Sequence, residues 1–176
     1  MVQVDHDNVG ACKELVTVLF AKGIQNIAYL GSNMDQMVNR CRYQGYEEAY
    51  RKGKRKLNQD LVYTDLSSKA MVEKAVEELK KSGVECILCQ DDYICDEAVR
   101  KLSHMGVRIP DQMKVASCHY SRILENYPVT VTSLKFNITE LGRRSCQVLL
   151  DMIHGKTVPD KTLLDYEIIL KESTKG

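Results

Sequence analysis

The feature that most constrains this chain is the regular alternation of short apolar strands with longer amphipathic segments. Apolar spacing predicts helices over residues 8–22, 37–52, 68–82, 95–105 and 138–154. Glycine follows four of these helices, at Gly23, Gly83, Gly106 and Gly155. Each of these glycines stands where a left-handed residue turns the chain toward the next strand. Strands that alternate with helices form right-handed crossovers, so the pattern predicts an α/β, doubly wound fold with a mainly parallel sheet.

The predicted strands are short and mostly apolar. They lie at residues 2–4, 24–32, 61–65, 86–89, 114–118, 129–134 and 163–174. The last of them alternates apolar and polar residues, as a half-exposed edge strand does. In open parallel sheets, ligands bind beyond the carboxyl ends of the strands, and the loops that follow these strands are therefore where a site is expected.

Two adjacent acids, Asp91 and Asp92, follow the predicted strand 86–89 directly. Four roles fit such a pair: general acid and base, metal ligands, a helix cap, or acceptors for a polar ligand. No nucleophile or metal cluster accompanies them in the sequence, so acid–base and metal chemistry are disfavoured. A cap and a ligand contact can coexist, because one acid can bind the helix start while the other faces the cleft.

Composition excludes several classes of function. The net charge of +1 over 176 residues creates no field that would attract nucleic acid or an anionic membrane. No apolar run reaches the roughly 20 residues that cross a bilayer, and the polar start is not a secretory signal. The seven cysteines, odd in number and dispersed, predict reduced thiols in the cytoplasm. Cys86 and Cys89 form a C-x-x-C pattern, but within a strand they are expected to be buried structural thiols.

Several stretches at consistent spacing together resemble the lactose-repressor (LacI/GalR) family. VDHDNVGACKELVTVLFAKGIQNIAYLGS resembles its V-D-N, helix, strand and glycine-turn element, and RCRYQGYEEAY is similar to its R-x-x-G-[FY] helix. ILCQDDYICDEAVRKLSHMGVRIPDQMKVAS resembles its strand, [ND]-D and I-P-x-D run. VTVTSLKFNITELGRRSCQVLLDMIHGK and the terminal LKEST match its last elements. The resemblance extends over essentially the whole chain.

The resemblance implies the C-terminal part of an effector-binding domain, built like the type I periplasmic sugar-binding proteins. In that fold two α/β lobes close on a small molecule. Residues 24–129 and 161–176 would form the second lobe, nearly complete, and residues 1–23 and 130–160 would be pieces of the first. The family's helix-turn-helix and most of the first lobe have no counterpart here. The chain is therefore expected to be a fragment that does not bind operator DNA alone, and any DNA contact would come through the missing N-terminal domain.

The resemblance also implies ligand-binding roles for single residues. Arg42 stands at the R-x-x-G arginine, whose planar fork of donors suits vicinal hydroxyls or a carboxylate. Asp91 and Asp92 match the [ND]-D pair, which accepts hydrogen bonds from sugar hydroxyls. Leu66 stands where relatives often have an aromatic residue against the apolar face of the effector. A solvated arginine and a core leucine are the structural alternatives.

His119 departs from the family, which usually has aspartate at this position. The exchange removes a negative charge, and Arg40 and Arg42 lie nearby in the sequence. We therefore hypothesise an anionic effector such as a sugar phosphate or a sugar acid; a histidine satisfied by backbone groups is the alternative. Cys118 and His119 superficially suggest a nucleophile and its base, but neighbours in a strand point to opposite faces.

The expected function is sensing of a sugar-like small molecule by a cytoplasmic transcription regulator, as a homodimer, without cofactor, metal or chemistry on the ligand. A periplasmic solute-binding protein of a sugar transporter is the alternative, and a sugar-converting enzyme on the same fold is a more distant one. With most of the first lobe missing, the strands near Val2–Val4 and Val131–Leu134 are expected to lie adjacent, with an exposed edge that invites pairing with another chain.

Overall fold

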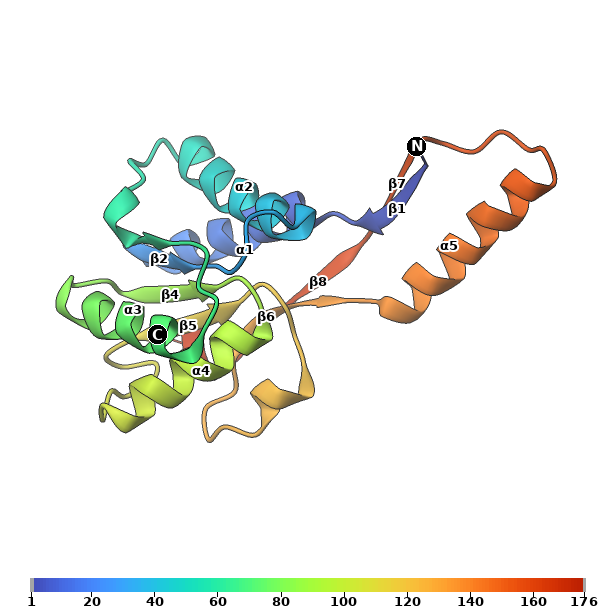
Figure 1. Ribbon diagram of the computed structural model, residues 1–176. Coiled ribbons are helices and arrows are strands. Elements are labelled where there is room, and N and C mark those ends of the chain that lie inside the picture. The colour runs from blue at the N-terminus through green and yellow to red at the C-terminus, as the bar shows by residue number, and fades with distance from the viewer. Residues whose placement is uncertain (1, 176) are drawn as a thin grey trace.

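The computed structural model describes residues 2–175 and confirms the predicted α/β architecture. A six-stranded sheet has the order β3-β2-β4-β5-β6-β8, in which only β8 is antiparallel to its neighbour. A separate pair, β1 and β7, is parallel. Strands and helices alternate along the chain up to β6 (Figure 1). Within residues 2–175, no helix is both long enough and apolar enough to cross a membrane.

The helices are α1 (Asn8–Ala21), α2 (Met37–Lys52), α3 (Lys69–Lys81), α4 (Asp92–His104) and α5 (Ile138–Ile153). The strands are β1 (Gln3–His6), β2 (Ile27–Leu30), β3 (Val62–Tyr63), β4 (Cys86–Cys89), β5 (Lys114–Ser117), β6 (Thr132–Phe136), β7 (Lys161–Leu164) and β8 (Tyr166–Ile169). The four glycines that were predicted to end helices all have positive φ, as a left-handed residue after a helix must. After α2 the left-handed residue is Lys54, because Gly53 stays helical.

Helices cover both faces of the six-stranded sheet, and each face has its own core. Along β2, Ile27 and Tyr29 pack toward the core that contains α1 and α2, whereas Ala28 and Leu30 pack toward the core of α3 and α4. The alternation follows from the period of two in a strand. Because both faces are closed, the ends of the strands are where this sheet can present polar side chains to a ligand.

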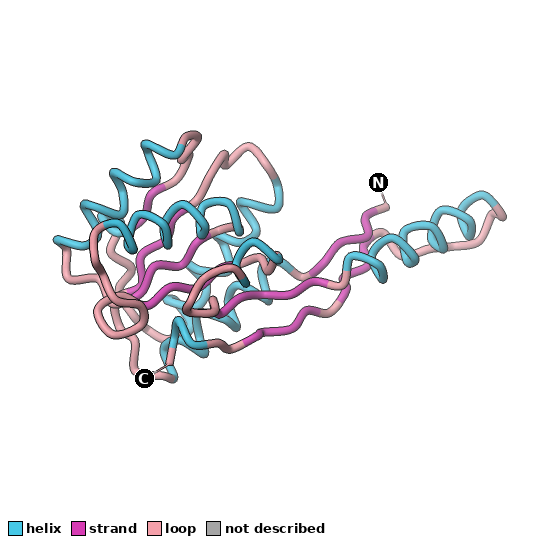
Figure 2. The backbone as a smooth tube through the Cα atoms, turned by 90° about the horizontal axis from the view of Figure 1, so that it is seen from below, coloured by secondary structure: helices cyan, strands magenta, loops and turns pink. Residues whose placement is uncertain are grey.

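A second part of the molecule projects from this layered body. It consists of β1, β7 and α5, and Figures 1 and 2 show it extending to one side. Three connections join it to the body: β1 to α1 at Asp7, β6 to α5 at Asn137, and β7 to β8 at Asp165. We call β1, α5 and β7 the projecting part, and the remainder of the described chain the body.

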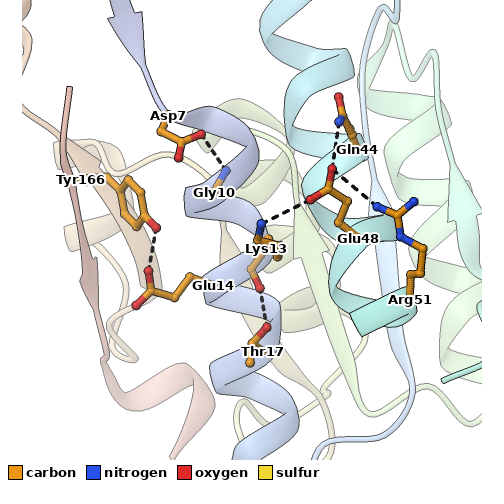
Figure 3. Close-up of polar contacts among 9 residues, drawn as sticks. All are labelled: Asp7, Gly10, Lys13, Glu14, Thr17, Gln44, Glu48, Arg51 and Tyr166. Atoms are coloured by element: carbon orange, nitrogen blue, oxygen red, sulfur yellow. Dashed lines mark hydrogen bonds and ion pairs between the residues drawn. The ribbon is translucent and has the colours of Figure 1, made fainter. Parts of the chain in front are cut away.

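Helix α1, assigned to the first lobe in the sequence reading, packs in the body core against α2. Gly45 of α2 permits the close approach, since a Cβ there would meet the Val9 carbonyl oxygen at 2.4 Å. Across the same interface Lys13 pairs with Glu48 at 3.3 Å (Figure 3). On its other side α1 is tied to β8 by the Tyr166 hydroxyl, which donates to Glu14 at 2.6 Å.

Three sequence expectations are corrected. The strands near Val2–Val4 and Val131–Leu134 are not adjacent: β1 pairs with β7, and β6 lies between β5 and β8. The last predicted strand is two strands in different sheets, because the chain crosses from β7 to β8 at Asp165. Helix α4 begins three residues early, at Asp92, because the Asp91 carboxylate caps it by accepting from the Ile94 amide.

Gly45→Ala tests the contact between α1 and α2. We expect it to destabilise the chain by about 1–3 kcal/mol, because the new methyl meets backbone atoms that cannot turn away, and this outweighs the gain in helix propensity. Thermal unfolding followed by circular dichroism measures the change. The matched control is Gly142→Ala in α5, where a Cβ meets nothing within 4 Å. That variant should gain about 0.5–1 kcal/mol, and equal effects of the two substitutions would contradict the packing argument.

Candidate functional site

Arg42 is a buried cation beside the carboxyl end of β4. Only 8% of the residue is exposed. Its Nε donates to Asn8 Oδ1 at 3.2 Å and its Nη1 donates to the Gln90 carbonyl oxygen at 2.9 Å. Both acceptors are neutral, and within residues 2–175 no carboxylate lies within ion-pair distance of the guanidinium. A buried charge without a countercharge is costly, and such a group is a natural receptor for an outside ligand.

The Gln90 side chain joins the ends of β2 and β4. Its Nε2 donates to Ser32 Oγ at 3.0 Å, and its Oε1 accepts from the Ser32 amide at 3.1 Å. Asn39 of α2 donates to the same Ser32 hydroxyl at 3.2 Å. This network is buried at Gln90 and Asn39. It therefore holds the start of α2, and with it Arg42, against the ends of β2 and β4.

The two acids after β4 have different roles. Asp91 Oδ1 accepts from the Ile94 amide at 2.8 Å, so this carboxylate is the cap of α4. Asp92 lies in the first turn of α4, and its Oδ1 is 3.4 Å from His119 Nδ1. Burial raises the pKa of Asp92, but the Ser121 hydroxyl and the His119 imidazole lower it more, so that the pKa lies below its usual value. The pair Asp92–His119 thus bridges the ends of β4 and β5.

Phe136, at the end of β6, lies among the nitrogen-bearing side chains of the site. Its ring centroid is 4.8 Å from that of His6 and 6.4 Å from that of His119, and the Arg42 guanidinium lies 5.9 Å from it. His6 is buried, and its Nε2 has no hydrogen-bond partner within residues 2–175. The structure therefore brings together two predicted residues, Arg42 and His119, around an aromatic ring that the sequence reading did not select.

Asn8, Gln90 and His6 were also missed as site residues. Asn8 was visible as part of the V-D-N element, and Gln90 directly precedes the acid pair. For His6 and Phe136 the sequence carries no such signal, because they are the last residues of β1 and β6, which lie in different sheets and meet only at these ends. Their contact depends on strand order.

Two predicted residues lie apart from this cluster. Leu66 is buried in the core between the sheet and the helices α3 and α4, as its structural alternative proposed. Arg40 is exposed, and its Nη1 donates to the carbonyl oxygens of Met34 and Asp35 at 2.8 and 2.6 Å. It braces the loop before α2 in this conformation.

The body and the projecting part together line a hollow of about 930 Å³ next to Phe136. Tyr120 and Arg122 contribute from the body, while Ile138 and Leu163 contribute from α5 and β7. Charged side chains line it as well, among them Arg122, Lys135 and Glu140, so its wall is as polar as it is apolar. Phe136 is the residue that links this hollow to Arg42 and His119, which do not line it. A hollow of this size can take a small molecule.

The thiols form no site of this kind. Cys86 and Cys89 are buried in β4, and burial raises the pKa of both, as expected of structural cysteines. The Cys118 sulfur lies 3.5 Å from that of Cys12, whereas His119 faces Asp92. The two side chains therefore have different partners. Both follow β5, which ends at Ser117, so the strand geometry expected from the sequence does not apply to them. Within residues 2–175 no group of three potential ligands could hold a metal ion.

Comparison with known families gives a match over almost the whole chain. The family of periplasmic binding protein-like domains matches residues 16–174. The chain belongs to this family. In this periplasmic binding protein-like domain, the polar cluster lies at the strand ends, and the hollow lies between the body and the projecting part.

Curated relatives of the domain are regulators of transcription. It is 27% identical over 173 residues to the HTH-type transcriptional regulator CelR of Thermobifida fusca, covering 97% of this chain and 51% of that protein. It is 26% identical to the HTH-type transcriptional regulator GntR of Escherichia coli, covering 92% and 49%. The chain therefore spans about half the length of the curated relatives it matches. These matches confirm the resemblance to the LacI/GalR family.

Solved structures agree with this assignment. A complex of the transcriptional regulator CelR with cellobiose superposes with a TM-score of 0.88 at 25% identity, covering 98% of this chain and 54% of that one. A LacI-type regulator from Bacillus cereus subsp. cytotoxis superposes with a TM-score of 0.90 at 23% identity, covering 100% and 64%. The fold of the periplasmic binding protein-like domain is therefore the one found in regulators of this type.

Asp92→Asn tests the pair between β4 and β5. Because the pKa of Asp92 is depressed in the folded chain, its carboxylate stabilises the fold above its unfolded pKa of about 3.9. We expect the variant to melt about 1–3 °C lower at pH 7, the range of a partly exposed pair. The difference should vanish as the pH falls through the folded pKa. Melting curves from pH 7 to pH 2.5 measure it.

The matched control is Asp35→Asn, because the Asp35 carboxylate forms no ion pair within residues 2–175. A destabilisation by Asp92→Asn that is as large at pH 2.5 as at pH 7 would contradict the assigned role. It would mean that the asparagine disturbs the start of α4 instead of removing a charge interaction.

Proposed function

We propose that this chain is the effector-binding part of a bacterial transcription regulator and that it senses a sugar-like small molecule. The observation that carries the proposal is the buried, uncompensated Arg42 at the strand ends. Its guanidinium lies 5.9 Å from the ring of Phe136, and Phe136 lines a hollow between two parts of the chain. The family supports it, since the relatives are HTH-type regulators and one matched structure is a complex of CelR with cellobiose.

In this proposal Arg42 and Asp92 bind polar groups of the effector, while His119 donates or accepts beside them. Asp91 caps α4 and does not contact the effector itself; its role is to hold the turn that positions Asp92. Leu66 acts only as core packing behind the site. Arg40 reaches the effector only if it releases the two carbonyl groups that it binds.

The signal would pass through the three connections between the body and the projecting part. An effector that contacts both sides of the hollow favours one relative orientation over another, and the population shifts accordingly. His6 and Phe136 end two of the connecting strands, so a ligand against their rings acts at the hinge itself. We propose that DNA is contacted by a separate helix-turn-helix region, which responds to this orientation. We place the protein in the cytoplasm and expect no reaction on the effector.

A solute-binding protein of a sugar transporter is less well supported. The relatives described above are regulators, and the dispersed thiols of this chain are those of a reduced compartment.

A thermal-shift screen tests the proposal. We expect at least one compound among neutral sugars, sugar phosphates, sugar acids and nucleosides to raise the melting temperature of the chain by about 2 °C or more, as binding to the folded state requires. Arg42→Gln should abolish the shift, whereas Arg51→Gln on the exposed end of α2 should keep it. A chain that no compound in any class stabilises would contradict the sensor function.

Self-association is proposed for the apolar surface of the projecting part. Leu149 and Ile153 of α5 are 57% and 68% exposed. Leu150 and Met152 of the same helix and Leu163 of β7 are exposed as well. The ribbon β1–β7 has only two strands, so each has an open edge. An exposed apolar surface of this kind marks an interaction site, and we propose that a second copy covers it.

Light scattering coupled to gel filtration checks this prediction. The chain should elute as a dimer at high concentration and shift toward a monomer on dilution, because a second copy covers the surface by mass action. Leu149→Glu combined with Ile153→Glu should give a monomer, because both charges fall on one face of α5. Met71→Glu is the control, since Met71 is also an exposed apolar residue but lies on α3 in the body. A monomer at all concentrations would refute self-association.

A further inference from the structure

Within the proposed effector site, the partners of the polar groups narrow the class of ligand. Arg42 uses Nε and Nη1 for neutral acceptors, and no hydrogen bond occupies its Nη2 within residues 2–175. The one acid that caps the neighbouring helix, Asp91, uses Oδ1 for the Ile94 amide. The other, Asp92, lies against His119. The positive charge of Arg42 is therefore left for a group from outside the described chain.

His119 and His6 each have a ring nitrogen without a hydrogen-bond partner among residues 2–175, and both lie near the ring of Phe136. His119 presents Nδ1 to Asp92, and its Nε2 has no hydrogen bond within the described residues. The buried Nε2 of His6 also has no partner there. Both imidazoles lie against Phe136, on which the Arg42 guanidinium also rests. Two ring nitrogens beside Arg42 are thus left without a hydrogen-bond partner in the described chain.

We infer that the effector carries an anionic group, a carboxylate or a phosphate, which accepts hydrogen bonds from Arg42 Nη2. A guanidinium fork matches the paired oxygens of either group, and a charge-assisted bond in a buried site is strong. The apolar face of a sugar ring would lie against Phe136, which supplies the aromatic surface that Leu66 lacks. The inference rests on the proposed function and specifies its ligand.

Three compounds that differ only at carbon 6 of one sugar test the inference: glucose, glucuronate and glucose 6-phosphate. Calorimetric titration of the chain should show that one of the two anions binds at least about tenfold more tightly than glucose, the effect of one charge-assisted contact. Which anion is preferred separates a carboxylate ligand from a phosphate ligand. Raising the salt concentration should weaken the binding of the anion and leave any binding of glucose unchanged.

Arg42 variants assign the preference to the site. Arg42→Gln should remove it, and Arg42→Lys should reduce it about tenfold, because the charge remains but the fork is lost. Arg51→Gln removes one positive charge from the far end of the same helix and should leave the preference intact. Circular dichroism melting of each variant verifies that it is folded before the titrations are compared.

Every other result overturns the inference. If glucose or another neutral sugar of the thermal-shift screen binds as well as its anionic counterparts, the site senses neutral sugars and the sensor function stands without the anion. An anion preference that persists in Arg42→Gln would show an unspecific charge effect. If no compound of any class binds, the inference and the proposed function fail together.

Discussion

The structure depends on the burial of a parallel sheet from both sides. β4, at its centre, is fully buried, with Cys86 and Leu88 in one core and Ile87 and Cys89 in the other. A strand enclosed in this way has no face left for a polar ligand, so polar chemistry is confined to its end. Gln90, Asp91 and Asp92 follow at that end. The same burial that stabilises the sheet thus determines where a ligand can be bound.

The close packing of α1 on α2 links the end of the sheet to the connection between α1 and β1 at Asp7. Gly45 and Val9 bring the helices together, and Asn8, at the start of α1, then accepts from Arg42 of α2. Arg42 also binds the Gln90 carbonyl, so one side chain joins α1, α2 and the tip of β4. Because α1 follows β1 directly, the position of Arg42 is coupled to the strand that leads into the projecting part. In the proposed function, ligand recognition and movement between the body and the projecting part would therefore involve the same residues.

Much of the fold was predictable because its signals are local. Helical spacing and the glycines at positions 23, 83, 106 and 155 depend on a few neighbouring residues, and all four glycines are left-handed in the structure. The errors arose where a distant partner decides. β7 and β8 look like one alternating strand, but β7 pairs with β1 and β8 with β6, so they separate at Asp165. The core position of Leu66 is likewise decided by distant partners, the buried residues of α3 and α4.

By itself, the sequence determined the fold class, the family resemblance and the end of the sheet at which polar residues gather, because strand and helix periods and strand-end positions are properties of short segments. The tertiary structure decided which of these residues meet. It left Arg42 without a countercharge, joined Asp92 to His119, and placed Phe136 and His6 beside them. These contacts join residues from β1, α2, α4, β6 and the segment after β5. Only strand order and helix packing bring such segments together, and no local pattern records them.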